Sequence, residues 1–165
     1  MNTMNTFEKQ KSIFILLHDI RSVHNVGSIF RTADAAGVSK IYLSGYTPTP
    51  TDRFGRPVKE LSKVALGGEL SVVWEQIKSP KALITKLKKQ GVQVIGIEQD
   101  ARSVDYKKVK SIQPTLYIVG NELDGMPKSI LDTCDIIAEI PMKGKKESLN
   151  VSVYFGIALF RMLNI

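Results

Sequence analysis

Three short segments carry polar side chains at spacings that could hold a ligand or act on one. In the first, VHNVGSIFRTADAAG at residues 23–37, the amide of Asn25 stands at the start of a predicted helix, Gly27 permits close approach, and Arg31 falls in the second turn. Asparagine is a favoured N-cap residue. A capped helix whose arginine reaches solvent would look the same, so this segment alone does not separate binding from structure.

The second segment, YIVGNELDGMP at residues 117–127, runs from a strand into Gly120 and turns again at Gly125. Glycines on either side of an amide and a carboxylate make a tight loop that can offer backbone groups to a small ligand. Glu122 could bind a cationic group or orient a partner such as Arg31. A simple turn is the structural alternative.

The third segment is IPMKGKKESLNVSVYFGIALF at residues 140–160. Ser148 and Asn150 bracket the start of a predicted helix, where backbone amides are unsatisfied and the local field is positive. Each can therefore cap the helix or contact a substrate. Three lysines precede them on a glycine-containing loop: Lys143, Lys145 and Lys146. Such lysines can bind phosphate, although solvated lysines are the default.

The hydrophobic pattern around these segments alternates strands with helices. Short apolar runs rich in β-branched residues predict strands at 12–18, 40–45, 70–74, 92–98, 115–120 and 135–141. Helical spacing, with glycine at several ends, predicts helices at about 26–36, 60–66, 79–90, 127–133 and 149–163. The segment YTPTPTDRFGRP at 46–57 is predicted to be an exposed basic loop.

This alternation predicts an α/β domain with a mostly parallel sheet, helices on both faces and right-handed crossovers. Ligands in such sheets bind at the carboxyl ends of the strands. The residues His24-Asn25, Gly120 to Glu122 and Pro141 to Gly144 each follow a strand. We therefore expect the three segments to meet at one edge and form a site.

The final helix is apolar on more than one side. One stripe comprises Val151, Phe155, Ala158, Leu159 and Met162, and a second comprises Val153, Ile157 and Phe160. A helix that is apolar nearly all round must be buried nearly all round. It is therefore either sandwiched within the domain or part of a subunit interface.

Size and composition fit a single domain over residues 1–165, with 43% hydrophobic residues to form its core. A single cysteine, Cys134, and the lack of a Cys/His cluster argue against a disulfide or a metal site. The apolar run at 13–17 is too short for a signal peptide or a membrane span, so we expect a cytoplasmic protein with no membrane partner.

The formal charge of +7 and the pI near 9.5 suggest an anionic partner. Nucleic acid is the commonest such partner for a basic domain, while a membrane surface and plain solubility compete as explanations.

Taken together and in this order, the three segments resemble the signature motifs of the SpoU (TrmH-like) RNA 2′-O-ribose methyltransferases of the SPOUT superfamily. The first resembles Asn-x-Gly-x-x-x-Arg-Thr-Ala-Asp at residues 25–34, and the second resembles Gly-Asn-Glu-x-x-Gly at 120–125. The third resembles Ile-Pro-Met-x-Gly at 140–144 followed by Ser-Leu-Asn-Val-Ser at 148–152. The resemblance covers roughly residues 13–163.

The resemblance implies an α/β domain with a C-terminal trefoil knot that works as a homodimer. It also implies S-adenosylmethionine as the cofactor, held in the knotted loops largely by backbone groups and apolar side chains. The matching cofactor residues are Gly120, Asn121, Ile140, Met142 and Leu149, with Glu98 and the residues just after it along the rim. No Gly-x-Gly-x-x-Gly follows the first strand, which argues against a nicotinamide oxidoreductase.

The implied reaction is methyl transfer to a ribose 2′-hydroxyl, in tRNA as the first expectation and in rRNA as the second. The family's catalytic residues map to Asn25, Arg31, Glu122, Ser148 and Asn150. A guanidinium is always protonated in practice, so we expect Arg31 to orient the hydroxyl and its phosphate rather than act as a base. Glu122 would hold Arg31 or its neighbours, Ser148 and Asn150 would position the hydroxyl and the cofactor, and Asn25 would act across the dimer interface.

Many relatives carry an additional RNA-binding domain, whereas about a dozen residues precede the first predicted strand here, so we expect the catalytic domain to recognise RNA itself. The candidate contacts are the basic residues Arg21, Arg53, Arg56, Lys59, Lys63, Lys143, Lys145 and Lys146. Two alternatives stay open: a non-catalytic RNA-binding domain of this fold, and a base methyltransferase with the same cofactor pocket.

Overall fold

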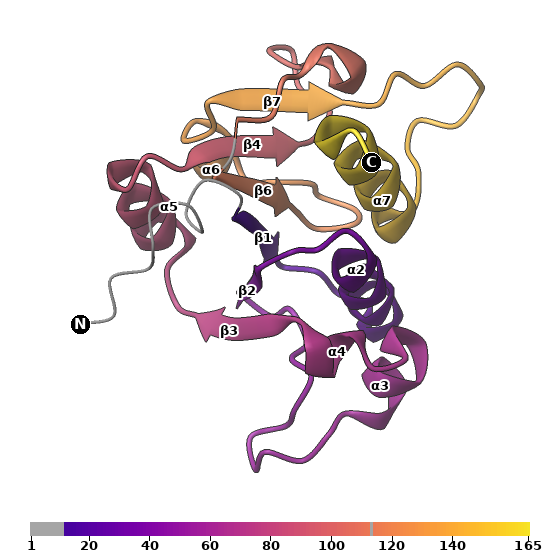
Figure 1. The fold of residues 1–165 in the computed structure, drawn as a ribbon. Coiled ribbons are helices and arrows are strands. Elements are labelled where there is room, and N and C mark those ends of the chain that lie inside the picture. Colours follow the sequence, from indigo (N-terminus) through magenta and orange to yellow (C-terminus); the bar gives the residue numbers. More distant parts are fainter. Residues whose placement is uncertain (1–11, 113) are drawn as a thin grey trace.

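The computed structural model describes residues 12–112 and 114–165. Within these residues one parallel sheet is formed by β1 (Ile13–His18), β2 (Lys40–Ser44), β3 (Val73–Ile77), β4 (Gln93–Ile97), β5 (Val104–Asp105), β6 (Thr115–Val119) and β7 (Ile136–Glu139). The strand order is β3-β2-β1-β6-β4-β7-β5 (Figure 1). The prediction of an α/β domain with a parallel sheet is confirmed, whereas the knot stays a prediction.

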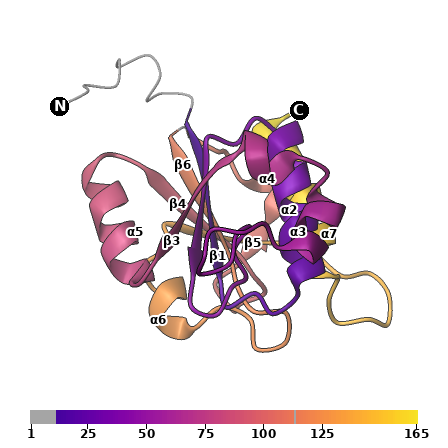
Figure 2. The same cartoon turned by 90° about the horizontal axis from the view of Figure 1, so that it is seen from below.

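Helices cover both faces of the sheet (Figure 2). On one face lie α2 (Val23–Ala35), α3 (Lys59–Ala65), α4 (Gly68–Ser71) and α7 (Val151–Leu163). On the other face lie α5 (Pro80–Lys89) and α6 (Lys128–Leu131). A short 3-10 helix, η1 (Tyr106–Lys108), contacts α7.

The core consists of two apolar layers, one on each side of the sheet. Tyr117, Phe30 and Phe155 are fully buried on the α2 and α7 side, and Leu16 and Ile118 belong to the layer beneath α5 and α6. Every residue of β6 is buried, as expected for a strand covered on both faces. Burying each aliphatic or phenylalanine side chain of these layers contributes about 1.5–3 kcal/mol to the free energy of unfolding.

Helix α2 begins at Val23, three residues before the predicted start, and its N-cap is Ser22 rather than Asn25. The Ser22 hydroxyl accepts a hydrogen bond of 3.2 Å from the backbone N–H of Asn25. The Glu122 carboxylate accepts two more, from the backbone N–H groups of Arg21 and Ser22. The earlier start therefore depends on a carboxylate 100 residues away in the chain, which the local pattern could not reveal.

The prediction of a strand at 70–74 is wrong. Residues Gly68–Ser71 form α4, and the strand runs from Val73 to Ile77 in register with β2. Gly68 packs so closely on α2 that a Cβ there would lie 2.8 Å from the carbonyl oxygen of Phe30, and this contact fixes the helical turn. Strand β5 and helix η1 were not predicted, because both are too short to show a periodicity.

Helix α7 buries only one of its two apolar stripes within the chain. Phe155, Ala158 and Leu159 are fully buried, whereas Val153 and Ile157 are 48% and 42% exposed. The second stripe is thus largely uncovered by the described part of the chain. No helix in the described ranges is long and apolar enough to cross a membrane.

The contact between α2 and α3 leaves no room for a side chain at Gly27. A Cβ there would lie 2.8 Å from the backbone oxygen of Leu61 and 3.0 Å from Cβ of Val64. We predict that Gly27→Val lowers the free energy of unfolding by roughly 2–3 kcal/mol, because overpacking forces the helices apart. Urea denaturation measures this loss, and Gly144→Ala, where a Cβ would meet nothing within 4 Å, is the control. Equal stabilities of the two variants would contradict the packing argument.

Candidate functional site

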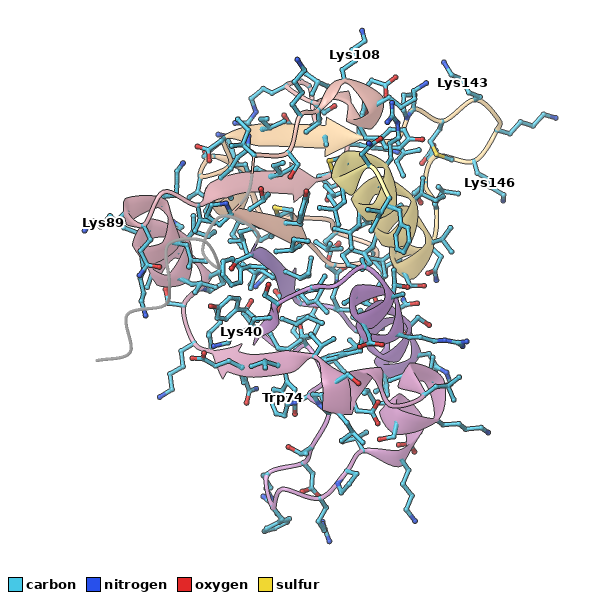
Figure 3. The ribbon with its side chains drawn as sticks, in the orientation of Figure 1. Lys40, Trp74, Lys89, Lys108, Lys143 and Lys146 are labelled. Atoms are coloured by element: carbon cyan, nitrogen blue, oxygen red, sulfur yellow. The ribbon has the colours of Figure 1, made fainter. Side chains whose placement is uncertain are left out.

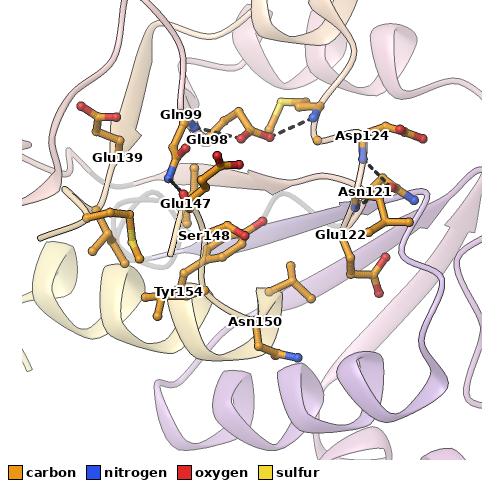
Figure 4. A pocket seen from close by; sticks show the side chains of 18 of the residues that line it. Glu98, Gln99, Asn121, Glu122, Asp124, Glu139, Glu147, Ser148, Asn150 and Tyr154 are labelled. Atoms are coloured by element: carbon orange, nitrogen blue, oxygen red, sulfur yellow. Dashed lines mark hydrogen bonds between the residues drawn. The ribbon is translucent and has the colours of Figure 1, made fainter. Parts of the chain in front are cut away.

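The carboxyl ends of β4, β6 and β7 enclose a cavity of about 620 Å³, closed on one side by the first turn of α7 (Figure 4). Strand β4 lies between β6 and β7, so the loops that follow the three strands are neighbours. The volume falls within the range of small-molecule sites. The cavity lies at the edge of the sheet where the sequence predicted a site.

The loop after β6 is shaped by the Asn121 side chain. Its carbonyl oxygen accepts hydrogen bonds from the backbone N–H groups of Leu123 and Asp124, both at 2.8 Å. Its Nδ2 donates to the backbone oxygen of Asp19 at 2.9 Å and to the Tyr46 hydroxyl at 2.7 Å. The amide is fully used in holding this loop against the end of β1.

The Glu98 carboxylate fastens the same loop to the end of β4. One of its oxygens accepts from the backbone N–H of Met126 and the other from that of Gln99, each at 2.9 Å. A Cβ on Gly125, which has φ +69°, would lie 2.6 Å from that carboxylate, and a Cβ on Gly120 would lie 2.8 Å from backbone atoms of Met126. Both glycines are therefore required by the close approach of this loop to its neighbours.

The loop after β7 is tied to β4 as well. The side-chain amide of Gln99 donates a hydrogen bond of 2.7 Å to the backbone oxygen of Glu147. Asn150 caps α7, because its Oδ1 accepts from the backbone N–H of Ser152 at 2.9 Å. This cap agrees with the sequence prediction for Asn150.

A chain of hydrogen bonds crosses the mouth of the cavity. Asn150 Nδ2 donates to Asn25 Oδ1 at 3.1 Å, and Asn25 Nδ2 donates to Glu122 at 3.1 Å. Partial burial raises the pKa of Glu122, but hydrogen bonds from Arg21 N–H, Ser22 N–H and the Asn25 amide outweigh it and hold the pKa below its ordinary value. Glu122 therefore stays ionised at neutral pH and keeps these three hydrogen bonds.

The cavity is acidic. Its lining includes five carboxylates and no Lys, Arg or His side chain: Glu98, Glu122, Asp124, Glu139 and Glu147. The Tyr154 hydroxyl also belongs to this surface, and burial raises its pKa, as do the charges of Glu98 and Glu122. The phenol stays neutral and can donate a hydrogen bond. Such a lining favours a cationic ligand and repels an anion.

The structure brings nearly all the predicted catalytic and cofactor residues to this cavity. Those that line it are Asn25, Glu98, Asn121, Glu122, Ile140, Met142, Ser148, Leu149 and Asn150. Gly120 does not line it and instead lies behind the Gly125–Met126 backbone. Asn25 bonds to Glu122 and Asn150 of its own chain, and its role across a dimer interface stays a prediction.

Arg31 lies outside the cavity lining. It is exposed on α2, six residues after Asn25 and thus about 9 Å further along the helix axis. The Glu122 carboxylate bonds instead to Arg21, Ser22 and Asn25, which precede Arg31 by six residues or more, so the expectation that Glu122 holds Arg31 or its neighbours stays a prediction.

The predicted RNA contacts are all exposed, and their function stays a prediction. Lys143 and Lys146 project from the loop between β7 and α7 (Figure 3). The same loop carries Lys145, and the remaining candidates are Arg21 before α2, Arg53 and Arg56 after β2, and Lys59 and Lys63 on α3.

Sequence reasoning missed Tyr154 and the acidic residues Asp124, Glu139 and Glu147. Tyr154 lies four residues after Asn150, so helical periodicity places both on one face, and that signal could have identified it. The carboxylates carry no such signal, because they come to line one cavity only after the strands have aligned. Among the described residues, no group of three or more His, Cys, Asp or Glu side chains could hold a metal ion.

Comparison with known proteins gives a consistent result. The model of a family described as the SpoU rRNA Methylase family matches residues 12–160. A tRNA (guanosine(18)-2′-O)-methyltransferase of Aquifex aeolicus is 32% identical, over 93% of this chain and 69% of the relative. The 23S rRNA (guanosine-2′-O-)-methyltransferase RlmB of Vibrio parahaemolyticus is 33% identical, over 93% of this chain and 59% of the relative.

The fold comparison agrees. An AdoMet-bound rRNA methyltransferase from Sinorhizobium meliloti superposes with a TM-score of 0.84 at 30% identity, covering 94% of this chain and 57% of that one. The chain thus spans little more than half the length of two of these three proteins.

The capping role of Glu122 has a defined pH dependence. Its folded pKa lies below the ordinary value of 4.5, so its stabilisation is present above pH 4.5 and is lost as the pH falls through the folded pKa. We predict that Glu122→Gln lowers the free energy of unfolding at pH 7 by roughly 1–2 kcal/mol. This range is already reduced for solvent screening of the partly exposed carboxylate. Urea denaturation at pH 7 and about pH 3 should show this gap shrinking in acid.

The control for Glu122 is Glu60→Gln, at an exposed carboxylate in the first turn of α3. This control should leave stability within about 0.5 kcal/mol of the parent. A gap for Glu122→Gln that stays constant from pH 7 to pH 3 would show that the ionised carboxylate is not the stabilising group.

Proposed function

Because the chain belongs to the SpoU rRNA Methylase family, we propose that it transfers the methyl group of S-adenosylmethionine to a ribose 2′-hydroxyl of RNA in the cytoplasm. The first candidate substrate is tRNA and the second is rRNA, since relatives of both kinds are about one-third identical. The observation that carries the proposal is the acidic cavity formed by the three motif segments.

The cavity fits this cofactor. S-adenosylmethionine carries a positive sulfonium and an ammonium group, which the five lining carboxylates attract, whereas the phosphates of a dinucleotide would be repelled. Ile140, Met142 and Leu149 provide apolar contacts for its uncharged part, and the backbone of the β6 loop provides polar ones. When bound, the cofactor supplies an electrophilic methyl group on positively charged sulfur.

The contribution of the side chains is mainly positioning. The ribose oxygen forms a bond to the methyl carbon while the carbon–sulfur bond breaks, and the hydroxyl proton leaves to solvent. Asn25, Ser148 and Asn150 orient the hydroxyl at the mouth of the cavity, where alignment alone can account for a large part of the rate. Glu122 fixes Asn25 in place, and because three hydrogen bonds hold its pKa below the ordinary value it is a poor base.

We also propose a homodimer that uses the uncovered face of α7. Val153 and Ile157 form an exposed apolar stripe on this helix, and α7 packs beside α2, which carries Arg31. A second copy of the chain on this face would cover the stripe. It would also enclose Arg31, which is outside the cavity of its own chain.

The reaction is tested by incubating the purified chain with deuteromethyl-labelled S-adenosylmethionine and, separately, tRNA and rRNA. Mass spectrometry of the digested nucleosides should find the label on the ribose in one of the two RNA pools. Label on a base would identify a base methyltransferase instead. Calorimetric binding of the cofactor without any transfer to either RNA would favour a non-catalytic RNA-binding domain.

The substitution Arg31→Ala separates methyl transfer from cofactor binding. We predict that methyl transfer falls at least a hundredfold, while the calorimetric affinity for S-adenosylmethionine stays within about twofold of the parent, because Arg31 lies outside the cavity lining. Lys89→Ala, at an exposed residue of α5 on the other face of the sheet, is the control. Loss of cofactor binding in Arg31→Ala would overturn this division of roles.

A further inference from the structure

The loop between β2 and α3 ends in an exposed aromatic ring flanked by arginines. Phe54 is 66% exposed, and the guanidinium carbons of Arg53 and Arg56 lie over its ring, 4.7 and 5.0 Å from the centroid. We infer that this tip, formed by Arg53, Phe54 and Arg56, binds an unstacked nucleobase and the adjoining phosphate of single-stranded RNA. That the bound RNA is also the methylation substrate rests on the proposed function.

Asp52 organises the tip. Its Oδ1 accepts from the backbone N–H groups of Phe54 at 2.8 Å and Arg56 at 3.0 Å, and its Oδ2 accepts from Arg56 Nε at 2.8 Å. Asp52 N–H donates to the backbone oxygen of Arg56 at 2.8 Å, and Gly55 makes the turn with φ +77°. The exposed ring is therefore held in one arrangement, which lowers the entropy cost of binding.

The base of the loop is attached to the candidate active site. The Tyr46 hydroxyl accepts a hydrogen bond from Asn121, and the Thr47 hydroxyl accepts one of 3.1 Å from the backbone N–H of Ile20. From there the chain extends past the edge strand β3 (Figure 1). The seven residue-to-residue steps from Thr47 to Phe54 can reach at most about 25 Å. The tip thus lies within a few nucleotides of the cavity.

The chemistry of the tip fits single-stranded RNA. Unstacked bases bind by stacking on aromatic rings and on guanidinium planes, while phosphates bind the charge of arginine. Arg56 is paired with Asp52, but Arg53 forms no ion pair with any described residue and is available to a phosphate. An acidic peptide would need the arginines without needing the ring, so the combination favours RNA.

The test measures binding of a fluorescein-labelled single-stranded 12-nucleotide oligoribonucleotide by fluorescence anisotropy. Phe54→Ala should weaken binding by between about fivefold and a hundredfold, and Phe54→Trp should restore it, because base stacking needs only an aromatic face. Arg53→Gln should lower the slope of log affinity against log salt by about 0.7. The same oligonucleotide annealed to its complement should respond little to Phe54→Ala, since its bases are already stacked.

The matched control is Ile112→Ala, because Ile112 is 68% exposed but precedes the central strand β6 and so lies at the amino ends of the strands, away from the loop that carries Phe54. It should bind RNA as the parent does. Unchanged single-strand affinity in Phe54→Ala, an equal loss for the duplex, or no binding of the probe by the parent would overturn the inference. If binding depends on Phe54 and the parent still transfers no methyl group, the proposed function fails while this site stands.

Discussion

The Glu122 carboxylate holds together parts of the chain that are far apart in sequence. It accepts hydrogen bonds from the two residues before α2 and from Asn25 in its first turn, while Glu122 itself belongs to the loop after β6. Through Asn25 the connection continues to Asn150, the N-cap of α7. Glu98 does the same on the opposite wall by fastening the β6 loop to β4. The two side chains thus tie the β6 loop to α2 and to the end of β4, on two sides of the cavity.

Charge is distributed unevenly around this cavity. The chain carries a formal net charge of +7, yet the lining contains only acidic charges. Exposed lysines and arginines instead occupy loops outside its lining, such as Lys143 after β7 and Arg53 after β2. An acidic interior with a basic exterior suits a protein that binds a small cation and a large polyanion at the same time. A single uniformly basic surface would favour the RNA but repel the cofactor.

The sequence predicted the architecture well because local pattern determined most of it. Alternation of apolar runs gave the parallel sheet, and Ser79 and Asn150 marked helix starts correctly. The errors arose where long-range contacts determine the local structure. Glu122 extends α2 to Val23. The packing of Gly68 on α2 favours a helical turn where a strand was predicted. For the site, the motifs identified the amides and apolar residues. The acidic lining depends on strand alignment and carries no local signal, whereas the spacing of Tyr154 from Asn150 was a signal that the motifs did not use.

In the proposed function, the cavity between the ends of β4, β6 and β7 holds the cofactor with its reactive end toward Asn25 and Asn150. A crystal structure of the chain grown with S-adenosylmethionine tests it most directly. We predict density for the ligand against Ile140, Met142 and Leu149, with its charged groups near the lining carboxylates. Ligand bound elsewhere on the chain, with this cavity empty at saturating concentration, would contradict it.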